Sequence, residues 1–296
     1  MKQPVEPSKE DCCNSGCNPC IFDVYEKQLR KYQIFLTQNE LPVTTENGIL
    51  QLEYTTFFVH NIYFICDSHK LITFKRLRQE KNKQPVQWNP GDHFLIKYCS
   101  DNTVCTRAYT PIKLKESCQD DFDFSIILKQ YNSGIVSTYL FNLQKGDETL
   151  WRGPYGSYEK MPTKYNRIIM LAQGTGIAPF ISIIDSILSD EDDMTKMFLA
   201  YCCPSIDVIL FRNELYNFKS FWNFTYKVFL SSSSDHKNTK YQEPIVYGKL
   251  KCDDLVNLKP FTSNDQVLLC GCSDFMEEYK GFFKNEGLLL DNIILF

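Results

Sequence analysis

The stretch LAQGTGIAPF, from Leu171 to Phe180, decides the fold of this chain. An apolar run precedes it at residues 168–170, and isoleucines at helical spacing follow it from Ile181 to Ile187. This order predicts a buried strand, a glycine turn and a helix with one apolar face. Because glycine has no Cβ, such a turn lets the backbone N–H groups of a helix N-terminus approach a phosphate. The stretch lacks the third glycine of the GxGxxG motif, so a tight structural turn stays open as the alternative.

Three further buried strands are predicted after this turn, at residues 197–201, 225–230 and 266–271. Strands that alternate with helices indicate a parallel sheet built from right-handed βαβ units. Ligands of such sheets bind beyond the carboxyl ends of the strands. The turn at Gly174 to Gly176 and the pair Cys270-Gly271 both stand at such ends. The sequence therefore predicts a nucleotide site at this edge of the sheet.

The preceding segment is rich in Tyr, Phe and Thr and predicts an antiparallel barrel. Short strands are expected at residues 55–59, 62–66, 71–74, 93–98 and 122–128, with turn signals between them. The predicted fold class is a two-domain chain, with an antiparallel β-barrel followed by an α/β parallel-sheet nucleotide-binding domain. The expected boundaries are 1–46 for a Cys/Pro-rich module, 47–162 for the barrel and 163–296 for the nucleotide-binding domain.

Length, composition and charge narrow the classes of protein. The 296 residues suffice for two domains with real cores, and 43% hydrophobic with 23% charged residues is typical of globular proteins. A formal net charge of −4 with no block of like charges offers nucleic acid no basic face. The sequence contains no apolar run of about 18 residues, so no integral membrane segment is predicted. Thirteen cysteines without a secretory signal predict reduced thiols and a cytoplasmic protein, with membrane association through a partner left open.

Two motifs in the strand-rich segment can bind parts of a nucleotide cofactor. In Arg107-Ala108-Tyr109-Thr110-Pro111, the arginine offers a planar fork of donors for a pyrophosphate. The aromatic ring two residues later can lie flat on a ring system, and the Thr110 hydroxyl can bond a ring nitrogen. The alternative is an ordinary strand. The run Gly134-Ile135-Val136-Ser137 predicts a helix start that Ser137 caps, where N–H groups take a second phosphate; the alternative is a plain N-cap.

Five motifs follow one another in a recognisable order. They are Arg-x-Tyr-Thr-Pro from Arg107, Gly-x-x-Ser from Gly134, Arg-Gly-Pro-x-Gly from Arg152, Gly-Thr-Gly-Ile-x-Pro from Gly174, and Cys-Gly at Cys270. This order resembles the ferredoxin reductase-type flavoenzymes and, within them, the NADH–cytochrome b5 reductases. The resemblance runs from about residue 50 to the final Phe296. A Cys-rich run from Asp11 to Cys20 resembles a small oxidoreductase-like module that is joined to some of these reductases.

The resemblance implies FAD as the cofactor and NADH as the co-substrate. Arg107, with Ala108 beside it, would hold the FAD pyrophosphate, and Tyr109 and Thr110 would contact the isoalloxazine and ribityl region. The remaining residues implied for the flavin site are those of the next strand and helix: Ile127, Lys129, Tyr131, Ile135, Val136 and Ser137.

On the nucleotide side, the resemblance implies that Thr175 meets the flavin and that Gly174 and Gly176 admit NADH. Cys270 and Gly271 would lie near the nicotinamide. Asp207 matches an acidic position associated with NADH preference, because a carboxylate repels a 2′-phosphate and accepts from a 2′-hydroxyl. Thr110, Lys129 and Cys270 are the predicted catalytic residues. For Cys270 the alternative is a small residue that lets the nicotinamide approach.

The implied reaction is hydride transfer from NADH to the flavin, followed by release of single electrons to an acceptor protein, with cytochrome b5 as the family default. No general base is needed, which agrees with a chain of only four histidines. Two alternatives stay open: a non-catalytic scaffold that keeps the fold, and a reductase that uses NADPH. The run Cys272 to Met276 replaces the family's proline run, and this departure concerns the nicotinamide side.

Four cysteines near the N-terminus, Cys12, Cys13, Cys17 and Cys20, form a cluster in the sequence. Four thiolates this close can bind zinc or an iron–sulfur cluster. Their spacing differs from the paired C-x₂-C of common zinc sites, so no metal is assigned. A docking element and free thiols are the other interpretations.

Overall fold

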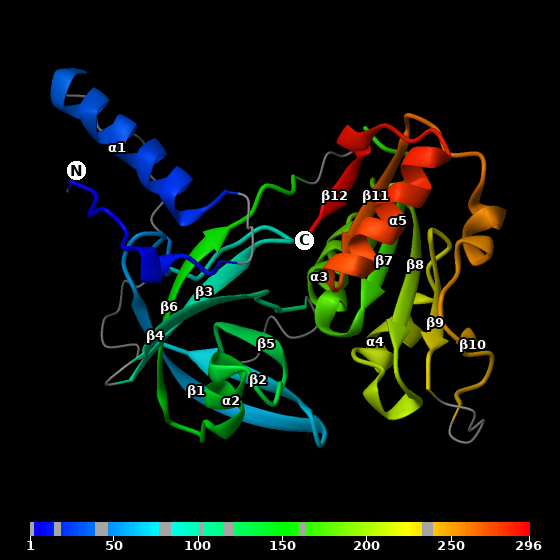
Figure 1. The fold of residues 1–296 in the computed structure, drawn as a ribbon, viewed down its shortest axis with the longest axis horizontal. Coiled ribbons are helices and arrows are strands. Elements are labelled where there is room, and N and C mark those ends of the chain that lie inside the picture. Colours follow the sequence, from blue (N-terminus) through cyan, green and yellow to red (C-terminus); the bar gives the residue numbers. More distant parts are fainter. Residues whose placement is uncertain are drawn as a thin grey trace. The chain divides into compact units, whose positions relative to one another are not determined.

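The computed structural model describes residues 3–14, 19–38, 47–76, 84–100, 103–114, 121–159, 164–232 and 239–296. The chain divides into two compact units, Met1–Tyr158 (unit 1) and Glu159–Phe296 (unit 2), which the blue-to-green and green-to-red parts of Figure 1 trace. Each unit has its own sheet and its own core, and each is described by itself.

Unit 1 contains a six-stranded antiparallel sheet in the order β4-β3-β6-β1-β2-β5. Its strands are β1 (Thr55–Cys66), β2 (His69–Lys75), β3 (His93–Ser100), β4 (Thr103–Tyr109), β5 (Phe124–Lys129) and β6 (Glu148–Tyr155). Just after β4, Ile112 forms an antiparallel bridge with Ser125 of β5, so the two ends of the sheet meet. Helix α2 (Ile135–Asn142) follows β5. The predicted antiparallel domain is confirmed.

The core of unit 1 combines aliphatic side chains with aromatic rings from the neighbouring strands β6, β1, β2 and β5. Phe124 contacts Phe57 edge-on and stacks on Phe74, with ring centroids 5.0 and 5.1 Å apart, and the buried Trp151 lies against both Phe74 and Phe124. Such rings bury large apolar areas and prefer these offset and edge-to-face arrangements. This core supports the strands β4 and β5 that carry the flavin motifs.

The two strands predicted at 55–59 and 62–66 are one strand, β1, so their separation was wrong. Polar His60 and Asn61 interrupt the apolar pattern, but the pairing of β1 with β2 continues past a register shift between Val59 and Asn61. A β-bulge absorbs one extra residue without ending the strand. The first part of β1 pairs with β6 and its later part with β2, so the bulge lies where the strand changes its pairing.

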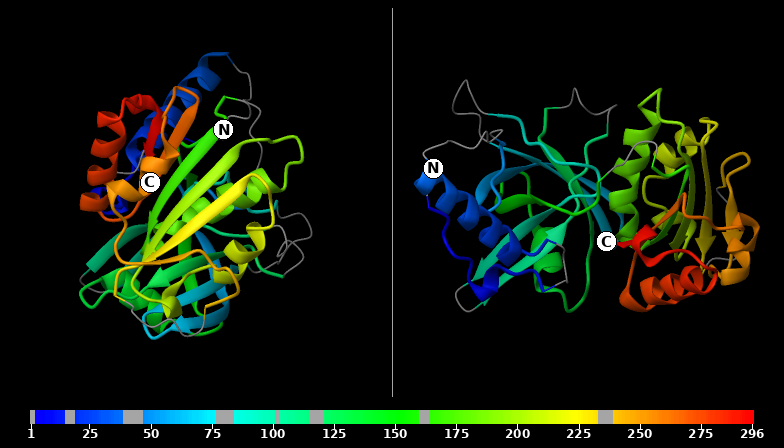
Figure 2. Two further views of the ribbon diagram at one scale, coloured as in Figure 1. Left: turned by 90° about the vertical axis from the view of Figure 1, so that its right-hand side faces the viewer. Right: turned by 90° about the horizontal axis from the view of Figure 1, so that it is seen from above.

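The N-terminal segment packs on the barrel and belongs to unit 1. It contains the short helix η1 (Lys9–Asp11) and helix α1 (Ile21–Gln38), which extends away from the strands in Figures 1 and 2. The sequence analysis did not predict α1. Ile21 and Val24 in its first turn are buried with Cys13, Leu95 and Tyr155 in a small separate core. The start of α1 is therefore anchored by apolar burial.

Unit 2 contains a six-stranded sheet in the order β10-β9-β8-β7-β11-β12, with every pair parallel. Its strands are β7 (Arg167–Gln173), β8 (Lys196–Cys203), β9 (Phe224–Leu230), β10 (Ile245–Tyr247), β11 (Asp265–Cys270) and β12 (Ile293–Leu295). Its helices are α3 (Ala178–Leu188), α4 (Arg212–Phe218) and α5 (Ser273–Asn285), with the short helices η3 (Gly174–Ile177), η4 (Ile206–Val208), η5 (Cys252–Leu258) and η6 (Leu290–Asn292). The predicted strand, glycine turn and helix around residue 174 are confirmed, as is the α/β class.

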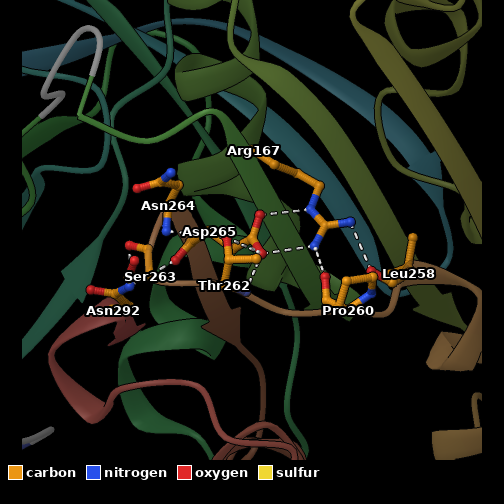
Figure 3. Close-up of polar contacts among 8 residues, drawn as sticks. All are labelled: Arg167, Leu258, Pro260, Thr262, Ser263, Asn264, Asp265 and Asn292. Atoms are coloured by element: carbon orange, nitrogen blue, oxygen red, sulfur yellow. Dashed lines mark hydrogen bonds and ion pairs between the residues drawn. The ribbon is translucent and has the colours of Figure 1, made fainter.

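A buried ion pair joins the starts of β7 and β11. Arg167 donates to both carboxylate oxygens of Asp265 at 2.8 Å and to the carbonyls of Leu258 and Pro260. Figure 3 shows the guanidinium between these partners, with Thr262 donating to the same carboxylate. A bidentate arginine–carboxylate pair is strong and fixes geometry. This pair sets the register of the two strands whose opposite ends carry the glycines.

Candidate functional site

In unit 1, the structure brings three predicted motifs to one region. Helix α2 contacts both β4 and β5, so the strand end at Arg107 to Thr110, the strand end at Ile127 to Tyr131 and the helix start at Ile135 to Ser137 lie together. Burial raises the pKa of Tyr109, and Tyr131 raises it further to a smaller extent. These motifs lie far apart in the sequence, and only the folded sheet unites them.

Ser137 is not the N-cap of α2, contrary to the prediction. Gly134 takes that position, and Ser137 is the third helical residue. The Ser137 hydroxyl donates to the Gly134 carbonyl at 3.0 Å and accepts the Tyr131 N–H at 3.2 Å, which ties the end of β5 to the helix. A Cβ on Gly134 would lie 2.4 Å from the Ser137 Oγ. A side chain at position 134 would therefore displace the Ser137 hydroxyl from these bonds. The first N–H groups of the helix have no partner within it.

Large side chains surround this helix start. Tyr131 and Ile135 are 53% and 52% exposed, while Ile127 on β5 is buried. The Lys129 ammonium lies 5.2 Å from the centre of the Tyr131 ring. An exposed apolar pair beside helix N–H groups suits a ligand that joins a flat ring to an anion. The residues present in unit 1 therefore fit a flavin with its pyrophosphate.

Arg107 is held by the N-terminal segment, a contact that the sequence did not indicate. Its guanidinium donates to the carbonyl of Cys13 at 3.2 Å and to that of Thr106 at 2.8 Å. Thr106 in turn donates to the Glu10 carbonyl at 2.9 Å. Because a guanidinium has five N–H donors, these carbonyls leave donors for an anion. We call residues 8–13 the N-terminal strap.

The strap is anchored through a buried arginine. Arg152, only 2% exposed, donates to the Asp11 carbonyl at 2.5 Å, forms an ion pair with the Asp11 carboxylate and stacks on the ring of Tyr54. The Arg-Gly-Pro-x-Gly motif thus contributes its arginine to holding the strap. Asp11 had no assigned role in the sequence, because only the fold brings it to Arg152.

In unit 2, glycine stands at the carboxyl ends of the strands for a different reason at each position. Gly174 has a φ of +56°, the left-handed region, and a Cβ there would meet nothing within 4 Å. Gly176 is different, since its Cβ would lie 2.4 Å from the carbonyl oxygen of Cys270. A Cβ on Gly271 would lie 2.8 Å from Gln173. The ends of β7 and β11 therefore pack directly on each other, and Gly174 is the glycine that leaves open space.

Gln173 is a residue of this edge that the sequence analysis missed. It ends β7, and its side-chain oxygen accepts the Cys272 N–H at 3.1 Å. This bond holds the start of the run Cys272 to Met276, which replaces the proline run of the resembled family. Helix α5 begins at the next residue, Ser273. The signal for Gln173 in the sequence was its place directly before the glycine turn.

Cys270 carries a thiol that stays protonated. Burial raises the pKa of the Cys270 thiol to about 12, so the thiolate needed for nucleophilic chemistry is scarce at neutral pH. Its sulfur lies 3.8 Å from the carbonyl oxygen of Phe296, whose ring packs edge-on against Phe180. This environment favours the interpretation of Cys270 as a small packing residue.

Asp207 lies at the same edge, in η4 after the end of β8, and is exposed. Hydrogen bonds to Glu243 do most to raise the pKa of Arg212, and Asp207 raises it to a smaller extent. Arg212 donates to both Glu243 oxygens, at 2.6 and 2.5 Å, and the Glu243 side chain is 1% exposed. The guanidinium is therefore committed to a buried carboxylate, and Asp207 presents its charge to solvent.

Three family models match successive parts of the chain: "Oxidoreductase-like protein, N-terminal" at residues 1–40, "Oxidoreductase FAD-binding domain" at 59–160 and "Oxidoreductase NAD-binding domain" at 170–280. The protein "NADH-cytochrome b5 reductase-like" of Mus musculus is 31% identical, over 99% of this chain and 95% of its own length. That of Homo sapiens is 30% identical, over 99% and 94%. The chain belongs to the cytochrome b5 reductase-like family. It is an oxidoreductase with an FAD-binding and an NAD-binding domain, and the predicted resemblance is confirmed.

Solved structures show that the fold of this cytochrome b5 reductase-like chain is shared. The cytochrome b5 reductase domain of Ulva prolifera nitrate reductase has a TM-score of 0.72 at 22% identity, covering 85% of this chain and all of that one. The CS-b5R domains of human Ncb5or, in the NAD+ form, have a TM-score of 0.69 at 21% identity, covering 82% of this chain and 69% of that one.

Two further findings concern membranes and metals. Among the described helices, none combines the length and apolar character needed to cross a bilayer. Within the described residues, no three or more His, Cys, Asp or Glu side chains are arranged to hold a metal ion. Of the N-terminal cysteine cluster, Cys17 lies outside the described residues.

Proposed function

We propose that this chain is an FAD-dependent reductase that takes a hydride from NADH and passes single electrons to cytochrome b5 or another one-electron acceptor protein. The convergence of Arg107, the end of β5 and the start of α2 in unit 1 carries the proposal. This region offers a guanidinium, helix N–H groups and exposed apolar side chains, a donor set that suits a flavin and its pyrophosphate. When bound, FAD supplies the step between a two-electron donor and a one-electron acceptor.

The residues of unit 1 would hold the cofactor and exclude water. Arg107 and the N–H groups of Ile135 and Val136 would bind the pyrophosphate, while Tyr109, Tyr131 and Thr110 would contact the ring and ribityl region. Lys129, on the same strand as the buried Ile127, would place a positive charge near the ring. A cation beside a flavin favours negative charge on the ring. Thr110 and Lys129 therefore remain the proposed catalytic residues.

The residues of unit 2 would bind NADH. Gly174 would leave room for the dinucleotide backbone, and Thr175 would stand at the edge where the dinucleotide enters. Gly271 and Cys270 would border the nicotinamide, with Cys270 acting through its small size. The exposed Asp207 would accept from the ribose 2′-hydroxyl. Among the described residues, Arg212 is paired with the buried Glu243, whose carboxylate neutralises its charge.

Replacing Arg107 tests the flavin site. Arg107→Ala should weaken FAD binding about 10- to 100-fold, because a hydrogen bond to a charged group contributes about 1.5–3 kcal/mol. The measurement is the flavin absorbance that stays with the protein after dialysis, followed by titration with FAD. The control is Lys145→Ala, which removes an exposed cation from unit 1. Full flavin retention in Arg107→Ala would place the pyrophosphate elsewhere. A colourless wild-type protein that cannot be reconstituted with FAD would favour the non-catalytic scaffold.

Replacing Asp207 tests the preference for NADH. Anaerobic NADH should bleach the flavin of the wild-type protein much faster than NADPH does. Asp207→Asn should reduce this preference by about tenfold or more, since juxtaposed like charges cost on the order of several kcal/mol. Stopped-flow bleaching of the flavin measures the preference for NADH. Turnover with cytochrome b5 and with an artificial acceptor measures the transfer of electrons to each acceptor. Asp192→Asn, an exposed aspartate at the other end of the strands, is the control. A wild-type preference for NADPH would overturn the assignment.

A further inference from the structure

Two thiols of the N-terminal segment face each other. The Sγ atoms of Cys12 and Cys20 lie 3.9 Å apart, and both residues are free cysteines of intermediate burial. A disulfide bond requires the two sulfur atoms to be about 2.05 Å apart, so closing the gap takes a shift of about 2 Å. Rotation of the two side chains supplies shifts of this size. The pair is therefore close to bonding geometry and remains partly accessible.

The backbone on each side of the pair is anchored separately. Cys12 follows Asp11, which forms the ion pair with Arg152, and the next residue is Cys13, whose carbonyl accepts from Arg107. Cys20 stands directly before α1. Its N–H donates to the Asp23 carboxylate at 2.8 Å, and its carbonyl accepts the Val24 N–H at 3.0 Å. The fold itself therefore keeps the two thiols together.

The surroundings of Cys12 favour its neutral thiol. The Asn14 N–H lies 3.4 Å from the Cys12 sulfur and favours its thiolate, but burial and the neighbouring Cys20 outweigh it and raise the pKa of Cys12. Both cysteines pack against the small core that contains Ile21 and Val24. Within the described residues no third ligand completes a metal site around them. Thiol–disulfide chemistry is the reaction that a neighbouring pair of this kind supports.

We propose that Cys12 and Cys20 form a redox-active dithiol that a low-molecular-weight disulfide, such as glutathione disulfide, converts into an intramolecular disulfide. One of the two cysteines, as its thiolate, attacks a sulfur of glutathione disulfide, which breaks that S–S bond and releases one glutathione. The second cysteine, on losing its proton, attacks the resulting mixed disulfide and releases the other glutathione. The protein loses two electrons and two protons, and one glutathione disulfide becomes two glutathione molecules. Cys12 belongs to the strap that holds Arg107, and neither cysteine is among the residues proposed to bind FAD and NADH.

The test uses the whole chain. The purified protein is first reduced and desalted, and it is then incubated in buffers with graded ratios of glutathione to glutathione disulfide. Acid quenching, alkylation and peptide mass spectrometry then identify each cysteine's state. We expect a species that has lost two hydrogens and carries no glutathione within residues 10–27. Cys20→Ser should instead trap glutathione on Cys12, and Cys12→Ser should trap it on Cys20, because the resolving thiol is missing. The exposed Cys99 should form only a mixed disulfide in every variant.

Cys17→Ser is the matched control, since it makes the same change in the same run and should leave the intramolecular disulfide intact. A disulfide that survives in Cys12→Ser or in Cys20→Ser would show another pairing and overturn the proposal. So would a wild-type protein in which Cys99 is glutathionylated while Cys12 and Cys20 stay reduced. Stoichiometric zinc that protects both thiols in the wild type and is lost in both single variants would replace the dithiol with a metal site.

Discussion

Gly176→Ala should destabilise unit 2 by about 3 kcal/mol, at the upper end of the usual cost of overpacking. The added Cβ would lie 2.4 Å from the Cys270 carbonyl oxygen and 2.8 Å from its carbonyl carbon. Those are backbone atoms of β11, which pairs with β7 along its whole length, so the obstacle cannot rotate away. The two strands must separate at their carboxyl ends, or the turn must rebuild. Either change should also weaken NADH binding.

The measurement is thermal denaturation combined with hydrogen exchange, in which peptides of unit 2 report separately from those of unit 1. Gly281→Ala is the matched control, because this glycine lies within α5 and a Cβ there would meet nothing within 4 Å. It should gain about 0.5–1 kcal/mol from the better helix propensity of alanine. The stability of Gly174→Ala should lie between those of Gly176→Ala and Gly281→Ala, because the added Cβ has space but alanine must adopt a positive φ. Equal stability of Gly176→Ala and the wild type would contradict the direct packing of these strand ends.

Asp265→Ala should cost unit 2 about 3–5 kcal/mol, the range for removing one partner of a buried pair. The Asp265 side chain is 6% exposed and accepts two bonds from Arg167 and two from Thr262, whose N–H lies at 2.6 Å and whose hydroxyl lies at 3.2 Å. Alanine removes the carboxylate that pairs with the Arg167 guanidinium, which is only 25% exposed and keeps two carbonyl acceptors and the ring of Phe261. Chemical denaturation of the variant and the wild type gives the difference in the free energy of unfolding.

An exposed ion pair in the same unit provides the comparison. Lys259 and Glu286 lie 2.6 Å apart, but their side chains are 35% and 30% exposed. Glu286→Ala should therefore cost about 1 kcal/mol or less, because water already solvates both charges. A similar loss in Asp265→Ala and Glu286→Ala would show that burial does not set the strength of the Arg167 pair.

The fold was predicted best where short-range pattern and long-range packing agree. The run from Ile168 to Leu188 combines an apolar strand, a glycine turn and a helical repeat, and it forms β7, η3 and α3 as expected. The strand β1 was divided in two because two polar residues at a bulge, His60 and Asn61, interrupt the period-two apolar pattern. The helix α1 was missed because its anchoring comes from contacts of Ile21 and Val24 with the barrel.

In the candidate site too, local sequence pattern predicted some features and long-range packing decided the others. The order of the motifs predicted the family, and it supplies the residues that are proposed to bind a flavin and a dinucleotide. It misplaced the cap of α2, since Ser137 was read from its residue type, whereas the backbone turn at Gly134 decides the position. The strap on Arg107 and the bond from Cys272 to Gln173 have no local pattern, because their partners come from elements that are distant in the sequence. The sequence shows a cluster of four cysteines, but only side-chain geometry places Cys12 beside Cys20.

By itself, the sequence determined the two-domain class, the family and the residue types at both predicted binding regions, because hydrophobic period, glycine and charge are local properties. The tertiary structure alone decided what each glycine does. Gly174 and Gly176 read alike in the turn, but the first faces open space and the second faces the Cys270 carbonyl. That difference depends on how closely β11 approaches β7, and the approach is set by the packing of two strands that lie far apart in the sequence of unit 2.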